Sequence, residues 1–545
     1  MRTTLPTALV VALAACSPVI VKPAEDGPTC GRGFRCTTST PSVPTTAVMD
    51  LLFVVDNSGS MAASQAKLAA SFDVLLERLQ ETNLDLDLRI AFTTTDLGNP
   101  QCPDSAPEHG DLVLSSCLDR VDAGEFLFDG VEPPLDGTFA CTDVCSLSDA
   151  ALTIQPTATT DDLQPQPRQW VELVGGATNL PDGVGLAEAL ACFAPQGIAG
   201  CGYESQLESM YQALLKSENA EGPNAGFLRP EAALAVVFLT DEVDCSFNPA
   251  HEAVFLSEKA LWSDPDATVP TSAVCWRAGV ECLGDPASYE SCAAVNVGVD
   301  GTLGAGDDDA VLRPMARYLD ALQRLEDERR SYNARADVLV AVLGGVPQGY
   351  AGEGLTYSAI NDQEHLDEFG VDPGCVDIDG SPALPPVRLR ELEEAQRVDD
   401  RSSLFSICAP EYAPALATLG DQLVDQIMPA CMPECVADVD AETEVVDVEC
   451  TLSEENIVTG ERREIPRCEG ESPSPPEGEA LCWVPLVDRG GQTSSLDDDM
   501  SQRCAEEGWN LEFRFVRREP SEQHRIADVA CRLSDLPAID CPDLY

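Results

Sequence analysis

The sequence predicts an α/β protein whose core is a doubly wound, mostly parallel sheet, with disulfide-rich insertions and a small β-rich C-terminal region. Three observations support this class. Apolar runs of strand length alternate with amphipathic helical patterns along residues 47–430. The strand runs are apolar throughout, as in parallel strands that are buried on both faces. Segments rich in cysteine, proline and glycine interrupt this alternation and dominate residues 436–545.

Each strand of the predicted sheet is a short apolar run, and helical patterns follow these runs. The strand runs are residues 51–55, 88–92, 233–239 and 338–345. One apolar stripe at helical spacing predicts a helix after the first strand: Leu68, Phe72, Leu75, Leu76 and Leu79. Further helices are predicted at residues 186–193, 207–215, 313–329 and 413–428.

The segments without such periodicity carry most of the cysteines. Residues 99–170 and 245–310 show no sustained period, so we predict two disulfide-stapled insertions on the surface of the domain. Residues 436–545 combine recurrent cysteines with proline and glutamate, and residues 509–516 alternate as a strand does. We therefore predict a small, cysteine-rich, β-rich C-terminal domain.

The N-terminus predicts export and a lipid anchor. An apolar run over residues 8–13 leads to Leu13-Ala14-Ala15-Cys16 and is too short to span a bilayer as a mature helix. This tetrapeptide resembles the bacterial lipobox, in which the cysteine receives diacylglycerol. Residues 1–15 are then a lipoprotein signal peptide and Cys16 is lipidated; an ordinary cleaved signal is the alternative. The proline-rich residues 16–46 are predicted to form a tether.

Cysteine usage agrees with an exported protein. The chain has 23 cysteines, and assigning Cys16 to lipid leaves an even number that can pair completely. Such usage is typical of an oxidising compartment. Close pairs such as Cys141 with Cys145 and Cys431 with Cys435 lack matched second pairs or histidine partners. Disulfides are therefore favoured over zinc thiolates, although their connectivity does not follow from the sequence.

The charge of the chain excludes several kinds of partner. The formal net charge is −61, because 94 acidic residues face 33 basic ones. Nucleic acid is excluded, because phosphate binding needs clustered lysine and arginine. Attraction to an anionic membrane surface is excluded for the same reason, so we expect membrane contact through the lipid anchor only. Ser17 is not the aspartate that favours inner-membrane retention, so the outer membrane is the expected location.

Two acids follow strand runs and form one candidate site. Asp56 comes directly after residues 51–55, and Asp241 follows residues 233–239. Ligands of doubly wound sheets bind at the carboxyl ends of the strands, so these acids are expected to lie close together. Asp56 opens the segment Asp56-Asn57-Ser58-Gly59-Ser60, where Gly59 gives the turn its conformational freedom. The hard oxygens of such a turn suit Mg²⁺.

The Asp-x-Ser-x-Ser pattern after a buried strand, matched by Val-Val-Phe-Leu-Thr-Asp-Glu at residues 236–242, resembles the metal-ion-dependent adhesion site of von Willebrand factor A domains. The resemblance implies this Rossmann-like fold for residues 47–430. It also implies that the Ser58 and Ser60 hydroxyls coordinate Mg²⁺, or Ca²⁺ or Mn²⁺ in its place. Asp56 and Asp241 would hold ligated waters, and a carboxylate of a protein partner would complete the shell.

The fifth ligand of that family is a threonine, and here the sequence departs from the pattern. Chain order places the corresponding loop at residues 197–204, which contain no threonine. Thr178 lies in a Gly-Gly-Ala-Thr-Asn segment that resembles the family loop in composition and is the candidate fifth ligand. The alternative is that Ile198 marks a missing ligand.

Three further acids near these strands have two interpretations each. Asp96 follows the second strand and either supports the site or serves as a turn residue. Glu242 and Asp244 are expected in a solvated loop, with a neighbouring Ca²⁺ site as the alternative.

The sequence indicates a binding protein and not an enzyme. The four histidines lie outside zinc or triad patterns, and Ser58 lacks the surroundings of a nucleophile elbow. We expect a cell-envelope lipoprotein that binds a protein ligand through an acidic side chain. The alternatives are a structural envelope protein without ligand binding and a hydrolase within residues 436–545.

Replacement of Cys16 tests the predicted anchor. Thioether lipidation requires the sulfur, so Cys16→Ser should leave the protein unlipidated and unprocessed by the lipoprotein peptidase. Mass spectrometry of the N-terminal peptide measures both properties. An unmodified mature start at another residue of the wild type would contradict the lipobox prediction.

Overall fold

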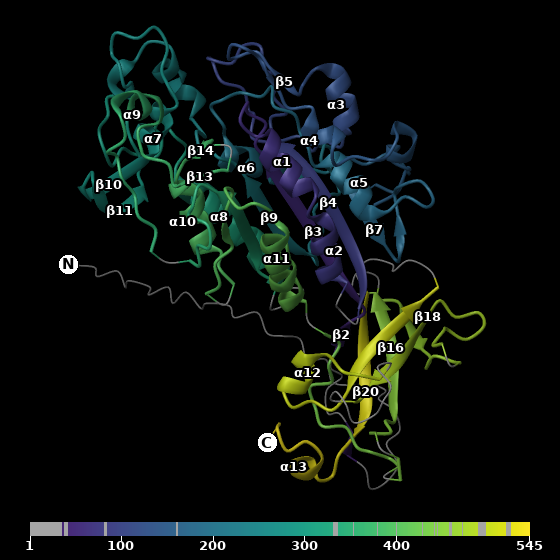
Figure 1. Cartoon of the computed structure of the whole chain (residues 1–545). Coiled ribbons are helices and arrows are strands. Elements are labelled where there is room, and N and C mark those ends of the chain that lie inside the picture. The colour runs from purple at the N-terminus through teal and green to yellow at the C-terminus, as the bar shows by residue number, and fades with distance from the viewer. Residues whose placement is uncertain are drawn as a thin grey trace, which may run out of the picture.

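The computed structural model describes residues 35–36, 42–80, 84–159, 162–330 and 336–544, apart from residues 353, 379, 399, 428, 441, 444, 457–459, 471, 489–497 and 519–524. Figure 1 shows a larger part built on a long sheet with helices and a smaller part made mainly of strands. The predicted signal peptide and Cys16 lie outside the described residues. No described helix has the length and apolar character needed to cross a membrane.

Seven strands form the central sheet, in the order β15-β12-β9-β3-β4-β7-β8. They are β3 Thr46–Val55, β4 Asp85–Thr94, β7 Val171–Val174, β8 Ala177–Thr178, β9 Ala233–Leu239, β12 Val338–Gly344 and β15 Leu404–Ser406. The five strands from β15 to β4 run parallel, whereas β7 and β8 add an antiparallel hairpin beyond β4. The sheet is therefore mixed, with a parallel part whose carboxyl ends share one edge.

Helices cover both faces of this sheet. Along β3, Leu51 and Phe53 belong to one apolar core, whereas Leu52 and Val54 belong to another, because successive strand side chains point to opposite faces. The first core is completed by α1 Ala62–Ala69, α2 Phe72–Leu79, α5 Leu186–Phe193 and α11 Ala413–Gln426. The second is completed by α6 Gln206–Glu218, α8 Met315–Arg330 and α10 Val387–Ala395. Figure 1 shows α2 and α11 packed side by side on the first face.

The predicted elements of this region match the observed ones closely, with three differences. The stripe from Leu68 to Leu79 is divided between α1 and α2, because the chain turns at Ala70 and Ser71, whose hydroxyl donates to the Lys67 carbonyl at 2.8 Å. The sequence patterns missed α10 and the short strand β15. They also missed the β7–β8 hairpin, which makes the sheet mixed.

Both predicted insertions contain more regular structure than their sequences indicate. The first carries α3 Cys117–Ala123, β5 Leu127–Phe128, β6 Leu135–Asp136, α4 Phe139–Thr142 and the 3-10 helix η1 Asp149–Leu152. The second carries η2 Pro249–Phe255, η3 Lys259–Leu261, α7 Ala273–Gly279 and the hairpin β10 Val280–Asp285 with β11 Ser288–Ala294. It has its own apolar core, which includes Phe255 and Trp276. After β12 come α9 Gln363–Phe369, β13 Cys375–Val376 and β14 Pro382–Ala383.

The C-terminal part is β-rich and recruits part of the predicted tether. Its main sheet pairs β16 Cys450–Asn456, β17 Arg462–Ile465 and β20 Arg525–Leu533 with β1 Arg35–Cys36 and β2 Ser42–Pro44. A second sheet joins β18 Leu481–Leu486 and β19 Glu512–Arg517, and two short helices are α12 Gln502–Glu506 and α13 Pro537–Asp540.

The prediction of a tether over residues 16–46 is therefore wrong for its described residues. β1 and β2 both pair with β20, and Val43 is buried. Pro44 lies in β2 and is compatible with this arrangement, because proline is tolerated at the edge of a sheet.

Disulfides hold the insertions and the C-terminal part, as predicted. The described pairs are Cys102–Cys201, Cys117–Cys141, Cys145–Cys192, Cys245–Cys275, Cys282–Cys292, Cys375–Cys408, Cys431–Cys504, Cys435–Cys541, Cys450–Cys531 and Cys468–Cys482. These pairs use every cysteine from Cys102 to Cys541, so metal thiolates are excluded for this part of the chain.

Replacement of Phe72 tests the packing of α2 on the sheet. The Phe72 ring lies 5.2 Å from that of Phe53 and 6.1 Å from that of Phe92, measured between centroids, and the residue is buried. Phe72→Ala should lower the free energy of unfolding by about 3–5 kcal/mol because it opens a cavity. Phe139 is 42% exposed, so the control Phe139→Ala should change the free energy by less than about 0.5 kcal/mol. Denaturant titration of the disulfide-intact protein measures both, and equal losses would contradict this account.

Candidate metal centre

Parallel pairing brings the two predicted acids to one edge of the sheet. Val55, the last residue of β3, is paired with Thr94 of β4 on one side and with Leu239 of β9 on the other. The ladder continues past the strand, because the Asp56 amide donates to the Leu239 carbonyl at 2.9 Å. Asp56 and Asp241 therefore leave neighbouring strands at the same level, as predicted from chain order.

The Asp56 carboxylate is buried and held at both oxygens. Its Oδ1 accepts the Ser58 amide at 2.8 Å, and its Oδ2 accepts the Thr240 hydroxyl at 2.7 Å. The side-chain amide of Gln65 in α1 donates to the Asp56 carbonyl at 2.7 Å. Since Thr240 precedes Asp241, this hydroxyl couples the two acid-bearing loops directly.

The serines of the motif face each other in the turn before α1. The hydroxyl oxygens of Ser58 and Ser60 lie 3.4 Å apart, with Ser58 buried and Ser60 exposed. Gly59 between them is required for space and not for a left-handed backbone, because a Cβ atom there would lie 2.7 Å from the Phe128 ring. The prediction that Gly59 supplies conformational freedom is replaced by this close approach.

The acids after β9 serve two different purposes. Asp241 and Glu242 lie at the edge with Asp56, and the Oε2 atom of Glu242 is buried without a hydrogen-bond partner. The prediction that Asp244 lies in a solvated loop is wrong. It is buried, its carboxylate accepts the Leu207 amide at 3.0 Å at the start of α6, and it pairs with Arg388 at 2.8 Å.

The loop between α5 and α6 is pinned against this edge. The Cys102–Cys201 disulfide joins it to the segment after β4. The Gly200 amide donates to the Asn57 carbonyl at 2.8 Å, and a Cβ atom on Gly200 would lie 2.2 Å from the Asn57 side chain. The loop therefore contacts the Asp56 turn closely, as the chain order of its residues predicts.

This loop also carries a buried acid, Glu204, which the sequence patterns did not single out. Glu204 is 2% exposed, and its Oε1 atom has no hydrogen-bond partner. Burial raises the pKa of Glu204 well above its usual range, and the charges of Asp56, Glu242 and Asp241 raise it further. Within the described residues, no lysine or arginine pairs with Glu204.

Burial also raises the pKa values of two other acids at this edge, Glu242 and Asp56. Burial raises the pKa of Glu242 well above its usual range, and Asp241 and Asp56 add to the effect. Burial also raises the pKa of Asp56, although the hydrogen bonds from Thr240 and Ser58 oppose it. The edge of the sheet thus concentrates negative charge in a place with little solvent.

Thr178 and Ile198 do not join this group. Thr178 lies in β8 and pairs with Leu173, which in turn pairs with Leu88, near the amino end of β4. Asp56 follows the carboxyl end of β3, so strand length and three intervening strand spacings separate it from Thr178. Ile198 is buried in a separate small core with Ala62 of α1.

Asp96 is a turn residue at the rim of the site. Its carboxylate accepts the Gly98 amide at 2.7 Å and the Cys201 amide at 3.2 Å, and its charge contributes to the raised pKa of Asp56. Chain order placed the loop at residues 197–204 beside the Asp56 turn, which the structure confirms. Glu204 could have been noticed in the sequence as the one acid of this loop, but its burial could not.

The oxygen atoms at this edge suit a hard divalent cation. The serine hydroxyls of the turn and the carboxylates of Asp56, Asp241, Glu204 and Glu242 are the available groups. Buried carboxylate oxygens without a donor are costly unless a proton or a cation satisfies them. The Oε1 atom of Glu204 and the Oε2 atom of Glu242 are such atoms. Among the described residues, however, no three carboxylates at this edge lie within 4.8 Å of one another, so any cation here would rely on the serine hydroxyls and on water as well.

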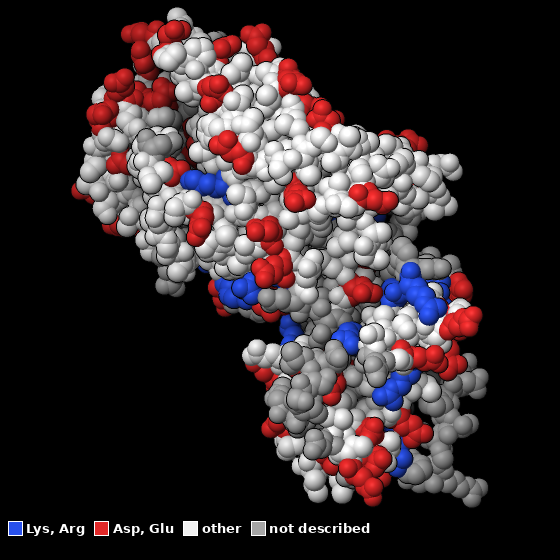
Figure 2. Space-filling view, turned by 45° about the vertical axis from the view of Figure 1, so that its right-hand side comes forward, with Lys and Arg blue, Asp and Glu red and all other residues white. Residues whose placement is uncertain are grey.

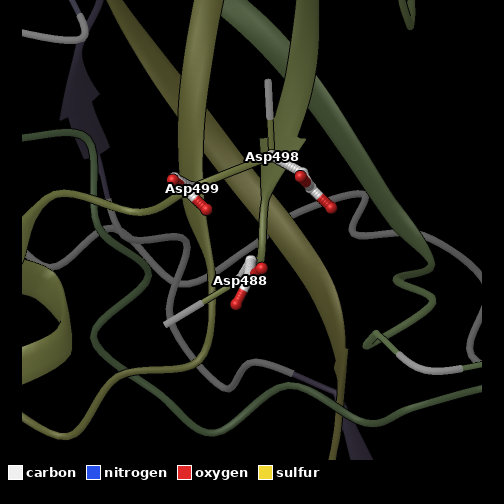
Figure 3. Close-up of side chains that lie close together, drawn as sticks. All are labelled: Asp488, Asp498 and Asp499. Atoms are coloured by element: carbon white, nitrogen blue, oxygen red, sulfur yellow. The ribbon is translucent and has the colours of Figure 1, made fainter. Parts of the chain in front are cut away.

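A second group of acids lies in the C-terminal part. Figure 3 shows Asp488, Asp498 and Asp499, whose carboxylate oxygens lie within 4.8 Å of one another. The Asp488 amide donates to the Asp498 carbonyl at 2.9 Å, which holds the two segments together, and Asp488 is fully buried. This group is a second place where a divalent cation could contribute to binding measurements.

Glu204→Gln tests the electrostatic strain at the edge in the absence of divalent cations. Because the folded state binds the Glu204 proton more tightly than the unfolded state, the linked stability is present below about pH 4.5 and is lost as the pH rises towards the folded pKa. The neutral amide avoids this loss. With a chelator present, Glu204→Gln should raise the free energy of unfolding at neutral pH by about 1 kcal/mol or more.

Denaturant titrations at acidic and neutral pH measure this difference. The advantage of Glu204→Gln should shrink as the pH is lowered, and the exposed control Glu221→Gln should show little effect at either pH. A variant that is less stable than the wild type at neutral pH would contradict the account.

Comparison with known proteins does not assign a family. No protein-family model and no curated protein matches the chain. Among solved structures, the chain aligns with the pilus adhesin SpaC from Lactobacillus rhamnosus GG in an open conformation, at 9% identity and a TM-score of 0.26, over 90% of this chain and 40% of that one. It also aligns with the pilus adhesin RrgA from Streptococcus pneumoniae, at 10% identity and a TM-score of 0.25, over 91% of this chain and 58% of that one. The chain thus spans less than two thirds of either adhesin, and TM-scores this low do not establish a shared fold.

Proposed function

We propose that this protein is a cation-dependent binding protein of the von Willebrand factor A type, exported to the cell envelope and anchored there by lipid on Cys16. One observation supports the proposal most strongly: the Asp56-x-Ser58-x-Ser60 turn and Asp241 leave adjacent parallel strands at the same edge. The Thr240 hydroxyl joins the two loops through Asp56 at 2.7 Å. The sheet covered on both faces by helices agrees with this fold.

The residues of the turn would hold Mg²⁺, Ca²⁺ or Mn²⁺. By the family resemblance, the Ser58 and Ser60 hydroxyls contact the cation, and Asp56 and Asp241 orient waters around it. The hydrogen bonds to both Asp56 oxygens keep this carboxylate in one orientation. When bound, the cation supplies a positive charge at the edge of the sheet that can attract a carboxylate.

The partner is a protein that presents an acidic side chain to this cation. Figure 2 shows acidic side chains spread over the visible face and few basic ones, in keeping with the net charge of −61. Such a surface repels an acidic partner at long range. Binding should therefore depend strictly on the cation, which makes the site a switch for adhesion rather than a catalyst.

Asp56→Asn and Ser58→Ala test the site. Each removes an oxygen or a charge that a hard cation needs, so each should weaken Mg²⁺ binding by about tenfold to a hundredfold. Thr178→Ala is the matched control and should leave the affinity unchanged, since Thr178 lies in the β7–β8 hairpin. Isothermal titration calorimetry with MgCl₂ on the full-length, disulfide-intact chain measures the affinities.

Titration of the wild type with divalent cations also distinguishes the two candidate functions, a cation-dependent binding protein and a structural envelope protein. Divalent-cation binding that weakens in both site variants but not in Thr178→Ala supports the binding protein. No affinity of the wild type for Mg²⁺, Ca²⁺ or Mn²⁺ at millimolar concentration would overturn the proposal in favour of a structural envelope protein.

A further inference from the structure

We propose that a cavity beside α6 binds a small organic acid, whose carboxylate pairs with Arg313 and whose apolar body packs against Phe247. This Arg313 cavity has a volume of about 390 Å³, which is typical of small-molecule sites. Its walls come from the segment after β4, from α6 and from the chain around Phe247 and Arg313. The candidate cation site contributes none of the described lining residues, so the inference goes beyond the proposed function and does not rest on it.

Backbone hydrogen bonds fix Arg313 in one wall of the cavity. Its amide donates to the Ser246 carbonyl at 2.8 Å, and its carbonyl accepts the Arg388 guanidinium at 2.6 Å. Phe247, which also lines the cavity, is paired with Leu312 in an antiparallel bridge. The cationic and the apolar part of this wall therefore lie on two segments that are held together.

The loop after β4 forms another wall and is clasped against α6. The Lys216 ammonium donates to the His109 carbonyl at 2.8 Å, and the Asn224 side-chain amide donates to the Gly110 carbonyl at 3.0 Å. A Cβ atom on Gly110 would lie 2.6 Å from the Cβ of Gln212, so the loop touches α6 closely. His109 has a φ of 56°, in the left-handed region that few residues other than glycine adopt. Such strain persists only where the surroundings enforce it, and it is frequent at binding sites.

Arg313 is the charge of the described lining that remains open to an anion. Its Nε atom is buried and has no hydrogen-bond partner, and no carboxylate of the described residues pairs with its guanidinium. Glu208 also lines the cavity, but Arg317 donates to both of its carboxylate oxygens at 2.9 Å. Lys216 is paired with Asp111 at 2.5 Å. A buried donor without a partner is costly, so an anion that reaches Arg313 removes this cost.

The lining favours a carboxylate on an apolar body. A guanidinium binds a carboxylate with two parallel N–H groups, which fixes the orientation of the ligand. Leu97, Phe247 and Pro249 offer apolar contact to the rest of the molecule. The chain carries 94 acidic residues against 33 basic ones. This field repels a doubly charged phosphate more than a singly charged carboxylate, so a monocarboxylic acid is the favoured ligand.

Isothermal titration calorimetry of the full-length, disulfide-intact chain with phenylacetate tests the inference. The buffer is freed of divalent cations, so the result is independent of the proposed function. Phenylacetate should bind with a Kd of about 1 mM or tighter. Phenylacetamide lacks the charge and acetate lacks the apolar body, so each should bind at least about tenfold more weakly. Inorganic phosphate should also bind more weakly than phenylacetate.

Two variants and one control assign the binding to Arg313. Arg313→Gln should weaken phenylacetate binding by about tenfold or more and leave phenylacetamide binding unchanged, whereas Arg313→Lys should lose less affinity because it keeps the charge. Arg324 of α8 is exposed and lies outside the cavity, so Arg324→Gln should have no effect. Circular dichroism checks that each variant is folded.

Three results would overturn the inference. They are a wild type without affinity for phenylacetate at millimolar concentration, equal affinities for phenylacetate and phenylacetamide, and equal losses in Arg313→Gln and Arg324→Gln. Phosphate that bound more tightly than phenylacetate would contradict the assignment of a monocarboxylic acid.

Discussion

The parallel pairing of β3 with β4 and β9 is the constraint on which the rest of the structure depends. It sets Val55 level with Thr94 and Leu239, so the loops after three strands begin at one edge. Helices on both faces bury the apolar side chains of these strands, which keeps the register from slipping. The acids at the edge can therefore be polar and mutually repulsive, because the apolar core below them supplies the stability.

The insertions are part of the same arrangement. The Cys102–Cys201 disulfide ties the segment after β4 to the loop before α6, and Cys245–Cys275 anchors the chain soon after Asp241. In the unfolded chain these loops are far apart in sequence, so the disulfides limit the conformations that must be lost on folding. They also hold Glu204 among like charges from which an unrestrained loop would move away.

Burial of several acids together has two opposite consequences. Without a cation, it raises the pKa of Glu204 and Glu242 and lowers the stability of the charged state. In the proposed function, a bound cation would offset this negative charge, so affinity for the cation and strain in its absence would have one cause. The acidic side chains on the face in Figure 2 would then make the binding of an acidic partner depend on the cation.

The sequence by itself determined the strands from 51–55 to 338–345, the core helices between them, the presence of disulfides and the position of Asp56 and Asp241 at one edge of the sheet. Most of these depend on local periodicity and on the rule that parallel strands end at one edge. Only the tertiary structure decided the place of residues whose surroundings come from distant segments. Val43 became part of the C-terminal sheet through β20, and the mixed character of the main sheet came from the β7–β8 hairpin. The position of Thr178 away from the Asp56 edge has the same reason: loop composition does not encode distance, whereas strand register does.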